Sequence, residues 1–341
     1  MIKFDKKSTP YILAEIGINH NGDFKIAENL IEEAAKAKVN GVKFQRRTIE
    51  EMYKEEYLQS PYIKDGSFGL TYGEHKKFLE FTNEELVMLK QIAESYGLDF
   101  IVSGFDFSGF DFIEKTLNPP FHKIASPLVT HHPLLKKVAR YGKTMVISTG
   151  MHDINEVDEM MEVIYPLNNN IVLLQCTTSY PTEDENVNLL VMTDYAKRYN
   201  VPVGYSSHDR GVILPAASVA LGGCFIEKHF TLDRTMKGPD HIASVEPRGM
   251  ELIVKYCKSV YYGLGSSVKG LTPGEIPAKA KHGYSIVASY DLDKDITLES
   301  HMIAFKQPGT GEKPSKVEKF LGKKLKVALK KDDDILINDL Y

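Results

Sequence analysis

The sequence predicts an α/β fold, a (β/α)₈ TIM barrel followed by a small C-terminal β-rich domain. Short apolar runs alternate with longer amphipathic stretches from residue 11 to about residue 263. There are eight such runs, and most are apolar throughout rather than alternating between apolar and polar residues. This is expected for parallel strands that are covered on both faces. Eight strand–helix units over about 250 residues are typical of a TIM barrel.

The expected strands are the eight apolar runs. They are Tyr11–Gly17, Gly41–Gln45, Asp99–Ser103, His122–Ile124, Thr144–Ser148, Ile171–Gln175, Pro202–Ser206 and Phe225–His229. A doubly wound open sheet is the alternative fold. It usually has fewer strands, and the stretch IGINHNG at the end of the first run lacks the GxGxxG fingerprint of dinucleotide binding.

Helical patterns fill the intervals between these strands. The clearest are Lys25–Lys38, Asn83–Tyr96, Ile154–Ile164 and Gly249–Tyr262. Asp23 is the expected N-cap of the first helix.

The connection 46–81 departs from this alternation of strands and helices. It is rich in tyrosine, and its apolar residues do not recur at the spacing of a helix or strand that packs on a core. Connections of this length in compact domains are usually functional or disordered. Its aromatic content argues against disorder. We therefore expect it to cover the substrate at the barrel mouth.

The character of the sequence changes after Gly263. Residues 264–283 are rich in Gly, Pro and Ser and are predicted to be a linker. Residues 284–341 hold the β-like pieces SIVASYDL, KLKVAL and ILIND between turn-forming stretches. The expected division is a catalytic barrel at 1–263, a linker at 264–283 and a β-rich domain at 284–341, which is marginal alone by its size.

Composition and charge exclude several function classes. Of the 341 residues, 43% are hydrophobic and 26% are charged, which is ordinary for a globular protein. The net charge of −4 gives no sign of a nucleic-acid or membrane partner, and no apolar run of about 18 residues could span a bilayer. Three cysteines are too few for a disulfide framework, and the first residues are polar, unlike a signal peptide. We expect a cytoplasmic protein.

Two lysines lie at strand ends that would converge on the barrel mouth, Lys43 in GVKFQ and Lys123 in HKIAS. A lysine inside a barrel strand is rarely structural, and two together could neutralise a phosphate and a carboxylate. A Schiff-base lysine is the competing role, because burial can shift a lysine toward neutrality. Serines at neighbouring strand ends favour anion binding, and these are Ser126, Ser148 and Ser206.

Glu15 lies near the end of the first strand. A carboxylate in a barrel strand is costly unless it is paired or functional. We expect Glu15 to pair with Lys43 or Lys123, or to act in catalysis or substrate binding. Gln45 points to the same side of its strand as Lys43, two residues away.

Two histidines close neighbouring strands, His208 in GYSSH and His229 in FIEKH. Imidazoles from adjacent strand ends can share a metal, and the alternative is that each is a satisfied core histidine. A zinc site usually has three protein ligands. His241 in GPDHIAS is a candidate third ligand, and water or substrate would otherwise complete the site. Asp240 is expected to bind a sugar hydroxyl or to cap a turn. Cys176 has no base beside it in the sequence and is expected to be a packing residue.

These motifs together resemble the sialic acid synthase family. AEIGINHNGD, VKFQ, KIAS, STGM, CTTSYPT, SSH, IEKHF and GPDHIAS follow the order and spacing of that family, and DLDKDITLES and PGTG resemble its antifreeze-like (SAF) domain. The resemblance covers nearly the whole chain. It implies a transferase that condenses phosphoenolpyruvate with an open-chain aldose, typically N-acetylmannosamine or a modified relative. The implied products are a nine-carbon 3-deoxy-2-keto acid and phosphate, released by C–O cleavage.

The resemblance also implies a cofactor, a partner and residue roles. The cofactor is a divalent metal, manganese or else magnesium or cobalt, held by His208 and His229. The partner is a second copy in a domain-swapped homodimer, whose SAF domain caps the site. The implied catalytic residues are Glu15, Lys43 and Lys123. The implied phosphoenolpyruvate contacts are Lys43, Ser103, Lys123, Ser126, Ser148, Thr178 and Ser206. The implied sugar contacts are Glu15, Gln45, Tyr180, Asp240 and Gln307.

Three positions depart from the family pattern. Leu128 replaces an acidic residue of many members, Gln307 replaces an arginine of bacterial members, and Thr178 replaces an asparagine of some. Losing a charge at two acceptor positions could shift specificity by about 1–3 kcal/mol each, so the expected acceptor is not ordinary N-acetylmannosamine. One alternative is a phosphorylated acceptor, held with the help of Arg46 and Arg47. Another is a non-catalytic carbohydrate-binding protein.

Overall fold

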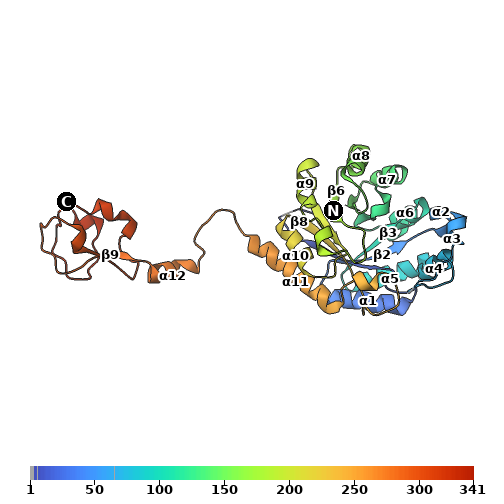
Figure 1. Ribbon diagram of the computed structural model, residues 1–341, viewed down its shortest axis with the longest axis horizontal. Helices are drawn as coiled ribbons and strands as arrows, with labels where there is room; N and C mark the ends of the chain where they lie inside the picture. The colour runs from blue at the N-terminus through green and yellow to red at the C-terminus, as the bar shows by residue number, and fades with distance from the viewer. Residues whose placement is uncertain (1–3, 6, 65) are drawn as a thin grey trace. The chain divides into compact units, whose positions relative to one another are not determined.

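The computed structural model describes residues 4–5, 7–64 and 66–341, and the chain divides into two compact units, Met1–Gly265 and Ser266–Tyr341. The first unit is built on eight strands, seen at its centre in Figure 1. They are β1 (Tyr11–Gly17), β2 (Gly41–Arg46), β3 (Asp99–Gly104), β4 (Phe121–Ile124), β5 (Thr144–Ser148), β6 (Ile171–Cys176), β7 (Val203–Ser207) and β8 (Gly223–His229). Each lies within two residues of its predicted bounds.

These strands form one parallel sheet in the order β3-β2-β1-β8-β7-β6-β5-β4. The two ends of the sheet meet, because the Ser103 hydroxyl of β3 donates to the Lys123 carbonyl of β4 at 3.2 Å. The result is a nearly closed eight-stranded barrel, so the predicted fold class is confirmed.

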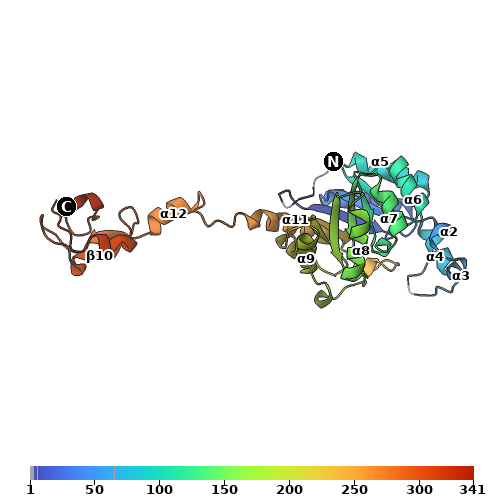
Figure 2. The same cartoon turned by 90° about the horizontal axis from the view of Figure 1, so that it is seen from above.

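Helices surround the barrel in both views (Figures 1 and 2). They are α1 (Phe24–Lys36), α2 (Ile49–Met52), α3 (Glu55–Leu58), α4 (Tyr72–Leu79), α5 (Asn83–Ser95), α6 (Phe107–Phe112), α7 (His132–Ala139), α8 (Ile154–Ile164), α9 (Val191–Arg198), α10 (Ile213–Ala220) and α11 (Pro247–Leu264), with short turns η1 (Ile113–Leu117), η2 (Ser126–Leu128), η3 (Asp184–Asn186) and η4 (His241–Ala243). Asp23 caps α1 as predicted, since its carboxylate accepts from the backbone N–H groups of Lys25 and Ile26. Within the described part of the chain, no helix is long and apolar enough to cross a bilayer.

The N-terminal end of the barrel is filled by an aromatic plug, formed by Phe4, Tyr11, Phe121 and Phe225. Their ring centroids lie 5.1–5.6 Å apart, mostly in edge-to-face pairs. The strands are also buried on their outer face, where they share a large hydrophobic core with the helices. Because apolar rings fill one end of the barrel, the polar side chains gather at the other.

The connection between β2 and β3 is largely helical. It contains α2, α3 and α4, which lie together at one side of the unit in both views, and then α5. Thr71 starts α4 with a capping box to Glu74. Tyrosine rings pack across these short helices, with Tyr57 and Tyr72 centroids 4.5 Å apart. The segment therefore has a small aromatic core of its own, which explains why no helical period toward the main core is visible in its sequence.

The second unit holds a two-stranded antiparallel sheet, β9 (Ser285–Ala288) and β10 (Ile303–Lys306), with the turns η5 (Ser300–Met302), η6 (Pro314–Lys319) and η7 (Ile337–Asp339). The stretch predicted as a linker contains α12 (Glu275–His282). The β-like pieces KLKVAL and ILIND do not form strands. Lys324, Leu325 and Leu329 of the first make only isolated bridges, and the second contains the turn η7. Turns recur too often there for a longer ladder to form.

The aromatic plug generates a stability prediction. Phe225→Ala is expected to lower the free energy of unfolding by about 3–5 kcal/mol, because a fully buried ring in contact with three others leaves a cavity. Urea denaturation followed by circular dichroism measures it. Tyr262→Ala is the control, since its ring is 70% exposed and the change should stay within about 0.5 kcal/mol. Equal effects of the two substitutions would contradict a packed plug.

Candidate active site

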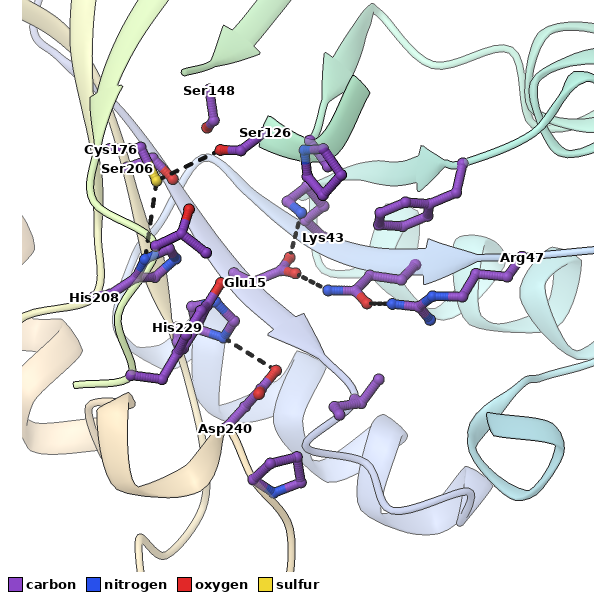
Figure 3. A pocket seen from close by; sticks show the side chains of 18 of the residues that line it. Glu15, Lys43, Arg47, Ser126, Ser148, Cys176, Ser206, His208, His229 and Asp240 are labelled. Carbon is purple, nitrogen blue, oxygen red and sulfur yellow. Dashed lines mark hydrogen bonds and ion pairs between the residues drawn. The ribbon is translucent and has the colours of Figure 1, made fainter. Parts of the chain in front are cut away.

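A cavity of about 290 Å³ lies at the C-terminal ends of the barrel strands, the end opposite the aromatic plug. Figure 3 shows side chains from several strands pointing into it. The predicted site residues that line it are Glu15, Lys43, Gln45, Lys123, Ser126, Ser148, Thr178, Tyr180, Ser206, His208, His229 and Asp240. The structure thus brings most of the predicted site together in one place.

Four charged side chains form a buried cluster on the cavity floor. Lys43 Nζ lies 2.8 Å from Glu15 Oε2 and 3.9 Å from Glu227 Oε1, and Lys123 Nζ lies 3.6 Å from Glu227 Oε2. All four side chains are at most 7% exposed. Strand register creates the central contact, because Glu15 of β1 stands opposite Lys43 of β2. Two carboxylates and two ammonium groups therefore balance one another in a buried site.

The surroundings set the charge of each member. Burial acts to lower the pKa of Lys43, but Glu15 and Glu227 outweigh it and raise that pKa. Burial likewise acts to raise the pKa of Glu227, and Lys123 and Lys43 outweigh it and lower that pKa. Burial raises the pKa of Glu15 and lowers that of Lys123. Lys43 therefore stays an ammonium group, which suits anion binding rather than a Schiff base, and a bound anion would favour the charged form of Lys123 too.

The serines differ in how they meet the cavity. The Ser148 hydroxyl accepts from Lys123 Nζ at 2.8 Å, the Ser126 hydroxyl accepts from the Gly150 N–H at 2.9 Å, and the Ser206 hydroxyl donates to Glu227 at 3.3 Å. Ser103 does not line the cavity. Its hydroxyl accepts from Lys43 Nζ at 3.2 Å, so it supports the lysine, and its direct contact with phosphoenolpyruvate stays a prediction.

The rings of His208 and His229 lie side by side, with centroids 5.2 Å apart, and Figure 3 shows them emerging from neighbouring strands. His208 Nδ1 lies 2.7 Å from the Thr177 carbonyl, so it carries a proton there and leaves Nε2 as an acceptor. Burial, together with His208 and Lys43, holds the pKa of His229 well below its ordinary value. His229 Nδ1 is buried without a hydrogen-bond partner, 3.9 Å from Asp240 Oδ2.

This pair fits a divalent cation. Imidazole nitrogens suit first-row divalent metals, and the unpartnered nitrogen of His229 is a buried polar atom that such an ion would satisfy. In the described residues no group of three or more His, Cys, Asp or Glu side chains could hold a metal. His241 is not a third ligand, because its Nδ1 contacts Thr231 at 2.7 Å and its Nε2 contacts Asn21 at 3.1 Å. Substrate or water would have to complete the coordination.

Cys176 lies in the cavity wall, although the sequence suggested a packing role. Its Sγ is 3.7 Å from Ser126 Oγ and 3.9 Å from His208 Nδ1. Burial acts to raise the pKa of the thiol, but His208 outweighs it and lowers that pKa, and Cys176 in turn raises the pKa of His208 against the effect of burial. The imidazole comes from another strand, so the sequence around the cysteine could not reveal it.

Glu227 is a cavity residue that sequence reasoning missed. It lies two residues before His229 on β8 and therefore on the same face. The alternation that predicted Gln45 beside Lys43 would have placed Glu227 beside His229.

The outer wall of the cavity is supplied by the β2–β3 connection, through Arg47, Tyr62, Tyr72, His75 and Lys76. Arg47 is already engaged, since it pairs with Glu80 at 2.7 Å and stacks on Phe105. Lys76 has no carboxylate in ion-pair contact among the described residues, and its Nζ lies 5.2 Å from the centre of the Tyr72 ring. Burial and Arg47 lower the pKa of Lys76 to about 8. Within the part of the chain that the structure describes, the outer wall thus holds an ammonium group that has no carboxylate at ion-pair distance.

The three positions that depart from the family pattern fall in different places. Leu128 is 4% exposed and belongs to the hydrophobic core rather than to the cavity lining, and its effect on the choice of acceptor stays a prediction. Thr178 lines the cavity, where its Oγ1 would be 2.3 Å from a Cβ atom at Gly150, which explains the glycine. Gln307 belongs to the second unit and donates to the His282 carbonyl at 2.9 Å, and its sugar contact stays a prediction.

Comparison with known proteins identifies the family. The NeuB family matches residues 30–269. The N-acetylneuraminate-9-phosphate synthase of Homo sapiens is 38% identical, with 96% of this chain and 91% of that protein covered. The N,N'-diacetyllegionaminic acid synthase of Legionella pneumophila is 35% identical, with 94% and 92% covered. The solved structure of N-acetylneuraminic acid (sialic acid) synthetase from Leptospira borgpetersenii, in complex with citrate, is 28% identical with a TM-score of 0.70, and the match covers 80% of this chain and 90% of that one.

The family match covers more than half of the chain, and the similarity to curated relatives extends over nearly all of it. The alternative of a non-catalytic carbohydrate-binding protein is therefore wrong. The chain belongs to the NeuB family, and it is an enzyme of the synthase type that these relatives represent.

Proposed function

We propose that this enzyme condenses phosphoenolpyruvate with an open-chain hexose related to N-acetylmannosamine, giving a nine-carbon 3-deoxy-2-keto acid and inorganic phosphate. The observation that carries the proposal is the meeting of the Lys43 and Lys123 ammonium groups with His208 and His229 in one cavity. The names of the relatives, which are synthases of N-acetylneuraminate 9-phosphate and of N,N'-diacetyllegionaminic acid, support the product class.

Charge balance supports an anionic donor together with a cation. The two lysines are offset by Glu15 and Glu227, so the floor is close to neutral before substrate binds. Phosphoenolpyruvate brings a phosphate of about −1.5 to −2 and a carboxylate. That charge needs a compensating positive charge in a buried site. A divalent ion on the two histidines would supply it, and burial raises the pKa of Glu15, which makes proton uptake by that carboxylate easier than in water.

His208 and His229 would hold this ion, manganese or else magnesium or cobalt. When bound, such an ion polarises the sugar aldehyde as a Lewis acid. C3 of phosphoenolpyruvate then attacks the aldehyde carbon, water adds at C2, and phosphate leaves with its C–O bond broken. Lys43 and Lys123 bind the donor's charges, with Ser126, Ser148 and Ser206 beside them. Glu15 is suited to give a proton to the oxygen that the aldehyde becomes.

The outer wall supports a second candidate, in which the acceptor carries a phosphate. Adding three carbons at the aldehyde turns C6 of a hexose into C9 of the product, so a 9-phosphate product requires a hexose 6-phosphate. Lys76 lines the cavity and, among the described residues, has no carboxylate at ion-pair distance; it lies near enough to Arg47 for that guanidinium to lower its pKa. A phosphate there would give Lys76 the anionic partner that it lacks.

We further propose a cytoplasmic homodimer in which the second unit of one copy covers the cavity of the other. Exposed apolar side chains on both units support docking. Met151, Leu190 and Ile213 lie near the barrel mouth, and Tyr284 and Phe305 lie on the second unit. Gln307 would then contribute to the acceptor site from the partner copy.

The histidine pair generates the first prediction of function. His229→Ala is expected to lower phosphate release from phosphoenolpyruvate with acceptor and Mn²⁺ by at least about 10²-fold, because the ion would lose one of its two protein ligands. A colorimetric phosphate assay measures it. His301→Ala is the control, since this histidine lies in the second unit with its side chain 60% exposed. Unchanged phosphate release in His229→Ala would refute the proposed site.

The outer cation generates a test of the acceptor. If the acceptor is phosphorylated, Lys76→Met should raise the KM for N-acetylmannosamine 6-phosphate by about 10-fold or more, since a charged hydrogen bond is worth about 1.5–3 kcal/mol. The KM for phosphoenolpyruvate should not change. Steady-state assays with a panel of hexoses, amino-hexoses and their 6-phosphates decide between the candidates, and Lys77→Met, at an exposed neighbouring position, is the matched control. Best turnover with ordinary N-acetylmannosamine would refute both a phosphorylated and a modified acceptor.

The same assay across pH gives a second readout of Lys76. Its ammonium group loses its proton as the pH rises through about 8. The KM for a phosphorylated acceptor should therefore rise above pH 8, whereas that for the unphosphorylated sugar should show no such rise. The effect should vanish in Lys76→Met. An identical pH profile for both acceptors would argue against contact between Lys76 and the phosphate.

The oligomeric state is tested by light scattering on the full chain. The expected mass is that of two 38.4 kDa chains. A monomer at micromolar concentration, with full activity at that concentration, would contradict a site that is shared between copies.

A further inference from the structure

A buried polar network lies directly behind the two histidines and is not used by the proposed chemistry. Side chains alternate along β8, so Glu227 and His229 face the cavity and Lys228 faces the opposite side. Lys228 is fully buried. Its Nζ donates to the Ser207 hydroxyl at 2.9 Å and to the backbone carbonyl of Asp209. One ammonium group therefore bridges from β8 to β7 and to the residue that follows His208.

Asp209 completes the network from the other side. Its side chain is fully buried, with Oδ1 3.8 Å from Lys228 Nζ. Oδ1 accepts from the Tyr205 hydroxyl at 2.7 Å and from the Ser207 hydroxyl, and Oδ2 accepts from the Gly211 N–H at 3.1 Å. Asp209 thus fixes the turn after β7 in place.

The position of these residues relative to the histidines is the main point. Ser207 and Asp209 flank His208 in the chain, and Lys228 immediately precedes His229. Register places Ser207 opposite Lys228 across the β7–β8 pair. Both hydrogen bonds of the Lys228 ammonium group therefore reach a residue adjacent to His208. The network ties together the two backbone points from which the two imidazoles project.

Stability alone does not account for a buried Lys–Asp pair. Removing two charges from water is costly, and well-packed apolar residues in their place are often as stable or more so. What such a network does provide is a fixed geometry. Residues that orient metal ligands from behind typically change metal affinity by about 10- to 100-fold when they are replaced.

We propose that Lys228 and Asp209 are positioning residues, which hold His208 and His229 at the separation that a shared divalent cation requires. The inference rests on the proposed function, because it takes the two histidines as the ligands. It predicts that metal affinity depends on a lysine that points away from the metal.

The test is titration of the full chain with Mn²⁺ alone, with free Mn²⁺ measured by electron paramagnetic resonance. Lys228→Met and Asp209→Asn are each expected to weaken binding by about 10- to 100-fold. Tyr141→Phe is the matched control for Tyr205→Phe. Both remove a tyrosine–aspartate hydrogen bond, of 2.8 and 2.7 Å, but Tyr141 bonds Asp111 of α6, on another part of the barrel. Tyr205→Phe should weaken Mn²⁺ binding measurably, and Tyr141→Phe should not.

A second comparison separates positioning from general destabilisation. The double variant Lys228→Met with Asp209→Asn removes both charges, so its melting temperature without metal should recover toward that of the wild type. Its Mn²⁺ affinity should stay low, because the tether between the strands is still missing. Recovery of affinity together with stability would show that only folding was affected and would overturn the inference. If Lys228→Met does not fold, Asp209→Asn and Tyr205→Phe decide by the same criterion.

Failure of the proposed function has a different signature. Wild-type protein that does not bind Mn²⁺, or binding that His208→Ala leaves unchanged, would overturn the histidine site and this inference with it. Binding that is lost in His208→Ala but unchanged in Lys228→Met and Asp209→Asn would overturn the inference alone.

Discussion

The site depends on four charges buried together, Glu15, Lys43, Glu227 and Lys123. Each would cost several kcal/mol if it were buried alone. Their alternation in space lets each ammonium group face a carboxylate, with Lys43 between two of them. This neutral floor can exist without substrate, and it makes binding of a multiply charged anion conditional on extra positive charge. The cation that we propose on His208 and His229 would supply that charge.

The barrel separates this cluster from its hydrophobic core. Edge-to-face aromatic rings fill the N-terminal end, and polar side chains occur where the strands end. The register of the strands then places the interacting side chains at the same height along the barrel axis. Glu15 of β1 stands opposite Lys43 on one side and His229 on the other. The charges of a substrate would therefore meet side chains from three adjacent strands that are already fixed in position, which reduces the entropy lost on binding.

Much of this was predictable from the sequence, and the limits have physical causes. The predicted strand ends show where along the barrel a side chain lies, and the alternation along a strand shows to which side it points. For this reason Lys43, Lys123, His208 and His229 could be assigned to the same end of the barrel. Alternation does not tell how deeply a side chain is buried, so the hydrogen bond from Lys43 to the Ser103 hydroxyl could not be predicted from the sequence. Residues of the β2–β3 connection, such as Lys76, could not be placed, because that segment folds on its own aromatic contacts. The path of the chain after β4 directs the side chain of Leu128 into the hydrophobic core. The neighbouring residues in the sequence do not reveal this direction.

Strand β8 shows why the register of this barrel is under tight constraint. Its last three residues point alternately to two sides, since Glu227 and His229 face the cavity and Lys228 donates to Ser207 and to the carbonyl of Asp209, the residues on either side of His208. A shift of one residue would exchange the two faces. It would place an unpaired ammonium group among Lys43 and Lys123, and it would bury a carboxylate and an imidazole where Asp209 now meets Lys228. Both results are electrostatically unfavourable, so the same charges that equip the site for an anion also help to select the one strand alignment in which the site exists.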